Sequence, residues 1–250
     1  MTISDSSSPF RIAIAATFTS EPLRRFVAFW SQEIHAGFDL VFAPYNQVPQ
    51  TLLDPASVFG TNTHGVNVVL LRLEDLSADG STLESNVSHI AEQLRAAGSL
   101  PVPLLVTLCP SLPGSVFATA FARMESLLAA SLEESPGAQF IPHHCVERLY
   151  PVTDPHSPEG EKLGRIPYSE AWFCALGSTL VRHTHALFRA PFKLIALDCD
   201  NTLWQGICGE DGPENVVLDP GRRALHEFML DQREDGVLLA MNSKNNEEDV

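Results

Sequence analysis

Apolar and polar positions alternate along the first part of the chain in a way that predicts strands separated by amphipathic helices. Apolar residues recur at intervals of three and four between 81 and 97, and similar helical patterns cover 20–34 and 116–132. Ser20 is a candidate cap for the first of these helices, and Pro22 suits its first turn. We interpret the short apolar runs as strands at 11–16, 38–43, 66–73, 102–109 and 138–141. The alternation predicts an α/β domain with a parallel sheet between two layers of helices.

Prolines and glycines then dominate the segment 142–167, which predicts a long loop between two domains. A helical pattern follows from Tyr168 to about Phe188. The expected organisation is a disordered lead-in at 1–9, an N-terminal α/β domain at 10–150, a connecting loop and helix at 151–190, and a second domain at 191–250.

The second domain repeats the strand and helix pattern on a smaller scale. Residues 194–197 read as a buried strand, and 237–241 as the next strand of a parallel sheet. A helix from Asp219 to about Asp235 lies between them, with Leu225, Phe228 and Met229 predicted to face inward. This order predicts a strand–loop–helix–strand unit with a crossover connection.

The net charge of the chain limits the kinds of partner that we expect. The 250 residues carry a formal net charge of −15, which disfavours nucleic acid and anionic membranes as partners. No apolar stretch approaches the roughly 20 residues of a membrane helix, and the N-terminus has no signal-peptide pattern. The five cysteines form no CxxC pair, which is typical of reduced thiols in a cytoplasmic protein.

A group of carboxylates follows the first strand of the second domain. Asp198, Cys199, Asp200, Asn201 and Thr202 come directly after it, at the edge where ligands of parallel sheets bind. A carboxylate can attack phosphorus, and a second one nearby can exchange protons with the leaving oxygen and with water. A phosphorylated substrate near two carboxylates calls for a divalent cation, and Mg²⁺ prefers oxygen ligands. The alternative interpretation is a turn built from Asp and Asn.

Two further pieces of sequence fit the same edge. Ser243 follows the strand 237–241, so its hydroxyl is a candidate phosphate ligand beside Asp198, and Lys244 adjoins it. These two residues also fit an ordinary polar helix start. The glycine-containing loop 203–212, with Trp204 as an anchor, fits either a surface hairpin or a cover over the site.

These motifs together resemble one family. The run KLIALDCDNTLWQGICGEDG, followed by LLAMNSKNNEEDV, is similar to the FkbH-like group (subfamily IIIC) of the haloacid-dehalogenase (HAD) superfamily. The likeness is strong over about 160–250. Residues 10–150 are similar in layout to SGNH-type or flavodoxin-like domains, although no GDS motif or late Asp-x-x-His pair supports an esterase triad.

The resemblance implies a role for each matching residue. It implies Asp198 as nucleophile, Asp200 as acid/base, both as Mg²⁺ ligands, and Thr202, Ser243 and Lys244 at the phosphate. It also implies that a glyceryl unit is taken from 1,3-bisphosphoglycerate, dephosphorylated and passed to an acyl carrier protein in polyketide-type biosynthesis. Cys199 is a candidate thiol for such a relay, and packing behind the strand end is its alternative.

The resemblance also implies site residues that we do not find among these 250 residues. HAD sites need a further Lys and additional acidic Mg²⁺ ligands, which we expect beyond residue 250. We therefore expect the sequence to be a HAD domain incomplete at its C-terminus, with poor Mg²⁺ binding and little turnover. Three hypotheses remain open: a glyceryltransferase and phosphatase, a HAD phosphatase that acts on a small metabolite without a carrier, and a catalytically inactive interaction module.

Overall fold

The computed structural model describes residues 10–190 and 192–244. The chain divides into two compact units, the first ending at Leu187 and the second beginning at Phe188. Within the described residues, no helix is both long enough and apolar enough to cross a membrane.

A parallel sheet of five strands, in the order β2-β1-β3-β4-β5, forms the centre of the first unit. The strands are β1 (Phe10–Ala16), β2 (Phe38–Phe42), β3 (Gly65–Leu71), β4 (Leu104–Leu108) and β5 (Ala138–Ile141). The helices are α1 (Leu23–Glu33), α2 (Val48–Leu53), α3 (Leu73–Leu76), α4 (Leu83–Ala97), α5 (Val116–Glu133), α6 (His143–Leu149), α7 (Pro158–Gly164) and α8 (Glu170–Phe188). The predicted α/β class with a parallel sheet is confirmed.

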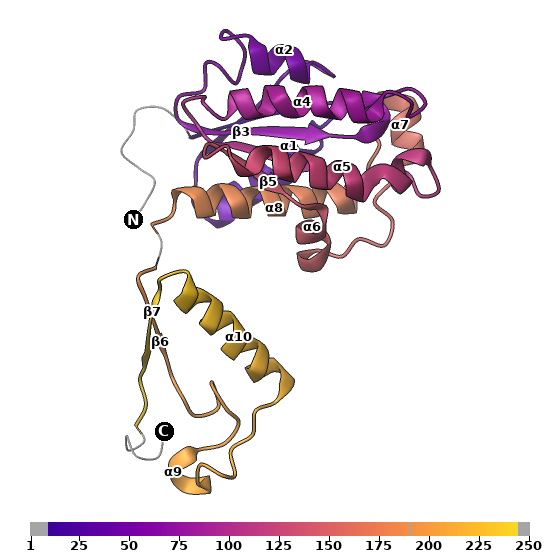
Figure 1. Cartoon of the computed structure of the whole chain (residues 1–250). Coiled ribbons are helices and arrows are strands. Elements are labelled where there is room, and N and C mark those ends of the chain that lie inside the picture. Colours follow the sequence, from indigo (N-terminus) through magenta and orange to yellow (C-terminus); the bar gives the residue numbers. More distant parts are fainter. Residues whose placement is uncertain (1–9, 191, 245–250) are drawn as a thin grey trace. The chain divides into compact units, whose positions relative to one another are not determined.

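Successive residues of the central strands enter two different cores. Val68 and Leu70 of β3 pack with α1 and α8, whereas Val69 and Leu71 pack with α2, α4 and α5. Figure 1 shows α4 and α5 lying along the strands of the sheet. Because helices cover both faces, all residues of β3 and β4 are buried, as is typical of parallel sheets.

Two local expectations for the first unit need correction. The predicted loop 142–167 contains α6 and α7, and Val146 of α6 is buried in the core beside α8. The segment therefore belongs to the first unit, because its scattered apolar side chains pack onto the sheet. Ser20 does not cap α1 with its side chain, and Pro22 occupies the cap position.

The second unit is a smaller α/β element. Strands β6 (Leu194–Leu197) and β7 (Leu238–Met241) pair in parallel, and helix α10 (Pro220–Glu234) connects them after the short helix α9 (Cys208–Asp211). Met229 of α10 is buried and Leu225 is half-buried, but Phe228 is exposed, so one of the three predicted inward residues is wrong.

The prediction of a buried strand at 194–197 is also wrong. Leu194 is 53% exposed, and exposed and half-buried residues alternate along β6. Within residues 192–244, β7 is the only strand paired with β6 and α10 is the only long helix of the unit. Two strands and one helix cannot surround an apolar run on both faces.

Candidate active site

The ends of β6 and β7 bring the predicted site residues to one edge of the small sheet. Leu197 pairs with Met241, and the Asn242 amide donates to the Leu197 carbonyl at 2.7 Å. Adjacent strands lie about 4.8 Å apart, so Asp198 and Ser243 continue from neighbouring backbones. The Asp198 side chain is exposed, while Ser243 is half-buried.

A tight turn returns Thr202 to the Asp198 carboxylate. The amides of Thr202 and Leu203 both donate to the carbonyl of Cys199, at 3.2 and 2.9 Å. The Thr202 hydroxyl then lies 3.3 Å from Asp198 Oδ2 and donates a hydrogen bond to it. The turn alternative and the site interpretation therefore describe one structure, in which the turn positions the Asp198 carboxylate.

The Asp200 carboxylate has a different environment. It is half-buried, and its Oδ1 accepts hydrogen bonds from Trp204 Nε1 at 3.1 Å and from the Cys208 amide at 3.0 Å. Two donors on one oxygen fix the orientation of the group. Trp204 thus anchors the loop, as its position in the sequence indicated, and its anchor point is the predicted acid/base itself.

The loop after these residues is closed by Asn201 and Gly206. Asn201 has a left-handed backbone (φ 60°), and its side-chain oxygen accepts from the Gly206 amide at 3.1 Å. The Asn201 amide donates to the Gly206 carbonyl at 3.2 Å. Asn tolerates this conformation better than most residues because its side chain bonds locally. The paired bonds hold the two ends of the loop together.

Helix α10 holds the same loop through two residues that sequence reasoning missed. Arg222 Nη2 donates to the Asn201 carbonyl at 2.9 Å, and His226 Nε2 lies 2.8 Å from the Leu203 carbonyl. Asp219 caps the helix by accepting from the Arg222 amide at 2.9 Å. The spacing of Arg222 and His226, one helical turn apart, was the available signal, since both side chains then point to one side.

The remaining candidates differ in accessibility. Cys199 is fully buried, which agrees with the packing interpretation of this thiol and leaves it remote from solvent. Lys244 is exposed. All five cysteines, which are among the described residues, are free thiols, as expected from their spacing.

The acidic residues of the site suit Mg²⁺ in type. Asp198 and Asp200 offer hard oxygen donors, and Mg²⁺ is commonly held by one or two carboxylates together with substrate phosphate and water. Within residues 10–190 and 192–244, no group of three His, Cys, Asp or Glu side chains is placed to hold a metal ion. Asp198 and Asp200 therefore match Mg²⁺ in the type of donor atom.

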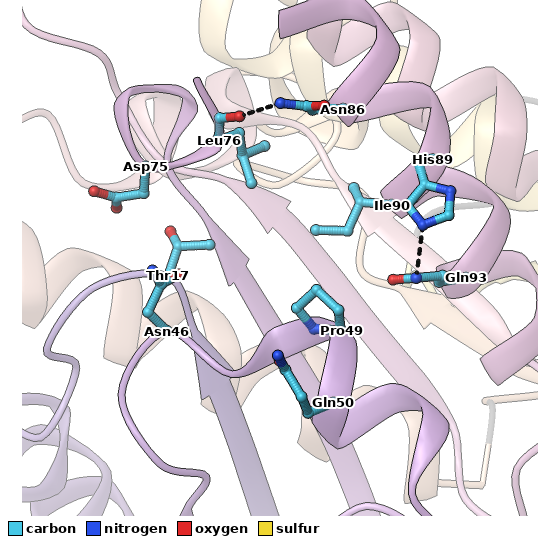
Figure 2. Close-up of a pocket in the computed structure, with 10 residues that line it drawn as sticks. All are labelled: Thr17, Asn46, Pro49, Gln50, Asp75, Leu76, Asn86, His89, Ile90 and Gln93. Carbon is cyan, nitrogen blue, oxygen red and sulfur yellow. Dashed lines mark hydrogen bonds between the residues drawn. The ribbon is translucent and has the colours of Figure 1, made fainter. Parts of the chain in front are cut away.

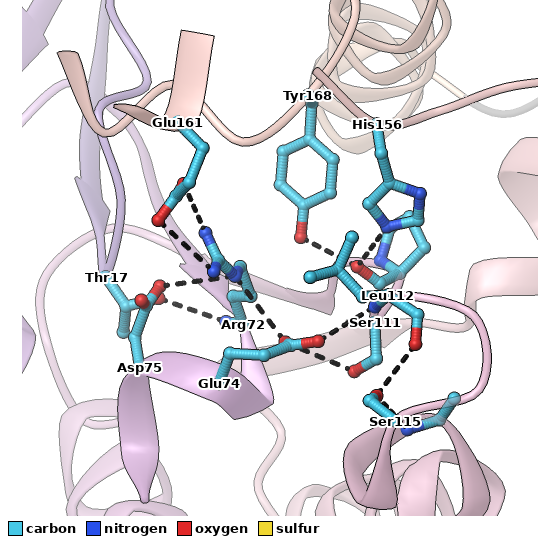
Figure 3. Close-up of polar contacts among 12 residues, drawn as sticks. Thr17, Arg72, Glu74, Asp75, Ser111, Leu112, Ser115, His156, Glu161 and Tyr168 are labelled. Carbon is cyan, nitrogen blue, oxygen red and sulfur yellow. Dashed lines mark hydrogen bonds and ion pairs between the residues drawn. The ribbon is translucent and has the colours of Figure 1, made fainter. Parts of the chain in front are cut away.

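The first unit contains a second group of polar residues, which sequence reasoning also missed. Arg72 directly follows β3, and its guanidinium bonds Glu161 of α7 at 2.8 and 3.4 Å (Figure 3). Glu74 lies 3.5 Å from Arg72 Nε and accepts from the Leu112 amide at 2.8 Å. Burial lowers the pKa of Arg72, but the hydrogen bond that it donates to Glu161 and the nearby Asp75 outweigh this effect, so the pKa is raised. This cluster ties α7 to the loops after β3 and β4.

Of the comparisons with known proteins, the one with solved structures agrees with the fold. No protein-family profile and no curated protein matches the sequence. The structure is similar to the N-terminal part of BF1531 from Bacteroides fragilis, which contains a phosphatase domain and was crystallised in complex with Mg. The TM-score is 0.74 at 18% identity, over 97% of this chain and 71% of that one.

A second solved structure is less similar. It is a proposed SGNH hydrolase from Slackia heliotrinireducens, with a TM-score of 0.40 at 12% identity, over 71% of this chain and 99% of that one. The likeness to the Bacteroides fragilis protein establishes a shared α/β fold, with a parallel sheet of five strands flanked by helices.

Proposed function

We propose that the second unit carries the nucleophile side of a HAD-type phosphoryl-transfer site, with Asp198 as nucleophile and Asp200 as acid/base. The observation that carries this proposal is the exposed Asp198 carboxylate at the end of β6, held by Thr202 and lying beside the β7 end with Ser243. The similarity to a structure containing a phosphatase domain supports it at the level of fold.

The reaction proceeds in two displacement steps. A carboxylate oxygen of Asp198 attacks phosphorus, the bond from phosphorus to the leaving oxygen breaks, and Asp200 gives that oxygen a proton. Water then attacks the aspartyl-phosphate and loses a proton to Asp200, which releases inorganic phosphate and restores Asp198. The bonds from Trp204 and Cys208 keep Asp200 oriented through both steps.

The phosphate itself needs hydrogen-bond donors and charge compensation. Thr202, Ser243 and Lys244 supply two hydroxyl groups and an ammonium group for its oxygens. Asp198 and Asp200 would hold Mg²⁺, which when bound offsets the negative charge of phosphate and carboxylates.

At a finer level, the motif resemblance favours a glyceryl unit from 1,3-bisphosphoglycerate as substrate and an acyl carrier protein as acceptor. Because Cys199 is buried, we assign the acyl transfer to the carrier thiol directly. The carrier thiol loses its proton to solvent, its sulfur attacks the acyl carbon, and the bond from that carbon to the acyl-phosphate oxygen breaks to release inorganic phosphate. Asp198 then attacks the remaining phosphate ester and removes that phosphate as in the two steps above. A phosphatase acting on a small metabolite is the second candidate, and the same exposed Asp198 favours it equally.

Beryllium fluoride with Mg²⁺ tests the nucleophile without requiring turnover, because it mimics an aspartyl-phosphate. At a Mg²⁺ concentration high enough to offset the poor Mg²⁺ binding expected of these residues, we expect a bound ¹⁹F NMR signal from the chain that disappears in Asp198→Asn. Asp235→Asn, which changes an exposed carboxylate beyond the end of α10, is the matched control and should keep the signal. Equal signals from the chain and Asp198→Asn would refute the proposal.

A second measurement separates the two candidate reactions. The chain is incubated with 1,3-bisphosphoglycerate and an acyl carrier protein, and the carrier is weighed by mass spectrometry. A mass gain that depends on Asp198 supports transfer, whereas phosphate release without a mass gain supports the phosphatase. If neither product forms and no beryllium fluoride signal is seen, the remaining hypothesis is the catalytically inactive interaction module.

A further inference from the structure

A cavity of about 260 Å³ lies in the first unit at the point where the sheet order reverses. Strand β1 lies between β2 and β3, so the chain moves to one side of β1 to form β2 and to the other side to form β3. Ligands of open parallel sheets bind in the crevice outside the carboxyl ends of the strands at such a point. Thr17 directly follows β1 and Asp75 lies in α3 just after β3, so the cavity occupies that position.

Three segments provide the polar lining, which Figure 2 shows converging from α2, the strand ends and α4. Asn46 and Gln50 come from the region after β2, and Asn86, His89 and Gln93 lie on one side of α4. Pro49, Leu76 and Ile90 add apolar surface. A few polar groups on an apolar background are typical of small-molecule sites.

Two side-chain oxygens of this lining accept no hydrogen bond within the described residues and are withdrawn from solvent. They are Gln93 Oε1 and Asp75 Oδ2, and Asp75 Oδ2 lies 4.0 Å from Arg72 Nε, an ion pair that leaves room for a hydrogen-bond donor. The Gln93 amide nitrogen already lies 3.1 Å from His89 Nε2. A buried acceptor without a donor costs about 1–3 kcal/mol. The terminal torsions of Asp and Gln are soft, so a small rotation turns either group toward a donor in the cavity.

The charges around the cavity define which ligands fit. No Lys or Arg is among the ten lining residues, and Asp75 is the only acidic one. Burial raises the pKa of Asp75 to about 6, although Arg72 and Thr17 oppose this effect. A phosphate or carboxylate ligand would meet no cation in the lining. Amide, hydroxyl and imidazole groups instead match ligand hydroxyls, which both donate and accept.

We propose that this cavity binds a small uncharged polyhydroxylated molecule of monosaccharide size, whose hydroxyl groups donate to Asp75 and Gln93. The volume is below the roughly 300–1,000 Å³ of drug-sized sites, which limits the ligand to about one sugar ring. This site does not involve Asp198, so the proposal does not depend on the proposed phosphoryl transfer.

Saturation-transfer NMR and titration with D-glucose, D-galactose and myo-inositol test the proposal on the whole chain. D-glucose 6-phosphate and D-glucosamine test charge selectivity. We expect saturable binding of at least one neutral polyol, and at least tenfold weaker binding of the sugar phosphate. No saturable binding of any neutral polyol at 10 millimolar, or binding of glucosamine alone, would overturn the proposal.

Variants locate the binding to this cavity. Gln93→Leu removes the buried acceptor and should weaken binding at least fivefold, whereas Gln139→Leu, at an exposed position of β5, should leave it unchanged. His89→Leu changes an exposed lining residue, so it serves as the second test if Gln93→Leu fails to fold. Equal affinity of Gln93→Leu, His89→Leu and Gln139→Leu would show that the ligand binds elsewhere.

Discussion

Strands β3 and β6 are both short and mostly apolar, but they have very different surroundings. Both are short apolar runs followed by a charged residue, Arg72 after β3 and Asp198 after β6. Every residue of β3 is buried, whereas exposed and half-buried residues alternate along β6. The charged residue after β3 is also buried in an ion-pair cluster, while the one after β6 is exposed.

The difference shows that an apolar run predicts a strand but not its burial. Strand β3 has neighbouring strands on both sides and helices over both faces. Strand β6 pairs with β7 alone within the described residues of the second unit. The charged residue after β3 is held in an ion-pair cluster, whereas the carboxylate after β6 is open to solvent.

The largest expected effect comes from Arg72→Met. This change leaves Glu74, Asp75 and Glu161 as neighbouring acidic groups without their cation, and should destabilise the first unit by roughly 3–5 kcal/mol. Urea unfolding is followed by fluorescence in a Trp204→Phe background, where Trp30 and Trp172 report on the first unit.

Arg123→Met is the control for Arg72→Met. Arg123 pairs with Glu84 at 2.9 Å, but the two side chains are 65% and 59% exposed. An exposed pair contributes about 0–1 kcal/mol, so the midpoint should hardly move. Similar losses from the two variants would mean that the Arg72 cluster is not a buried structural element.

A matched pair of leucines tests the comparison of the two strands directly. Leu70 of β3 is 0% exposed and Leu238 of β7 is 66% exposed. Leu70→Ala should cost roughly 2–5 kcal/mol through lost burial and the cavity left behind. Leu238→Ala should change stability by about 0.5 kcal/mol or less, as typical of surface positions. Chemical denaturation measures both, and equal costs would contradict the exposed state of the small sheet.

Asp75 gives the first unit a specific pH dependence. Its folded pKa of about 6 exceeds the ordinary 3.8, because burial disfavours the charged carboxylate. The folded state therefore binds more protons than the unfolded state between these values, so stability falls as pH rises from about 4 to about 6. The fall amounts to at most about 3 kcal/mol.

Asp75→Asn should remove this component, which urea unfolding at a series of pH values detects. Asp79→Asn is the control, since hydrogen bonds from Ser81 lower the pKa of Asp79 and its contribution has the opposite sign. A fall of unchanged size in Asp75→Asn would assign the pH dependence to other groups.

The smallest expected effect lies in the loop of the second unit. Asn201→Ala loses the bond to the Gly206 amide and places an alanine in the left-handed region, at a cost of about 1–2 kcal/mol. Hydrogen exchange at the Gly206 amide should accelerate accordingly. Asn201→Gly loses the bond but keeps the backbone conformation without strain, so its acceleration should be smaller. Equal rates would remove backbone strain as a cause.

Much of the fold followed from pattern alone. The apolar runs predicted the positions of β1, β2, β3, β4 and β5 to within a few residues. The signal is clearest for β3 and β4, which are buried at every residue, whereas the edge strands β2 and β5 are only partly buried. Helices α4 and α5 followed from their spacing. The segment 142–167 was misread, since α6 and α7 are too short for a helical pattern and depend on packing.

The candidate site was predictable only in part. The edge shared by Asp198 and Ser243 followed from the rule that parallel strands end together. The contacts of Arg222 and His226 with the loop did not, because they depend on where α10 packs.

The alternation of strands and helices, the parallel sheet and the carboxylates after β6 were readable from the sequence. The exposure of Asp198, the burial of Arg72 among acidic groups and the polar cavity beside β1 became known from the fold. The local sequence pattern fixes the backbone conformation of each segment. Burial and electrostatic partners are different, because they depend on residues that are distant in the sequence.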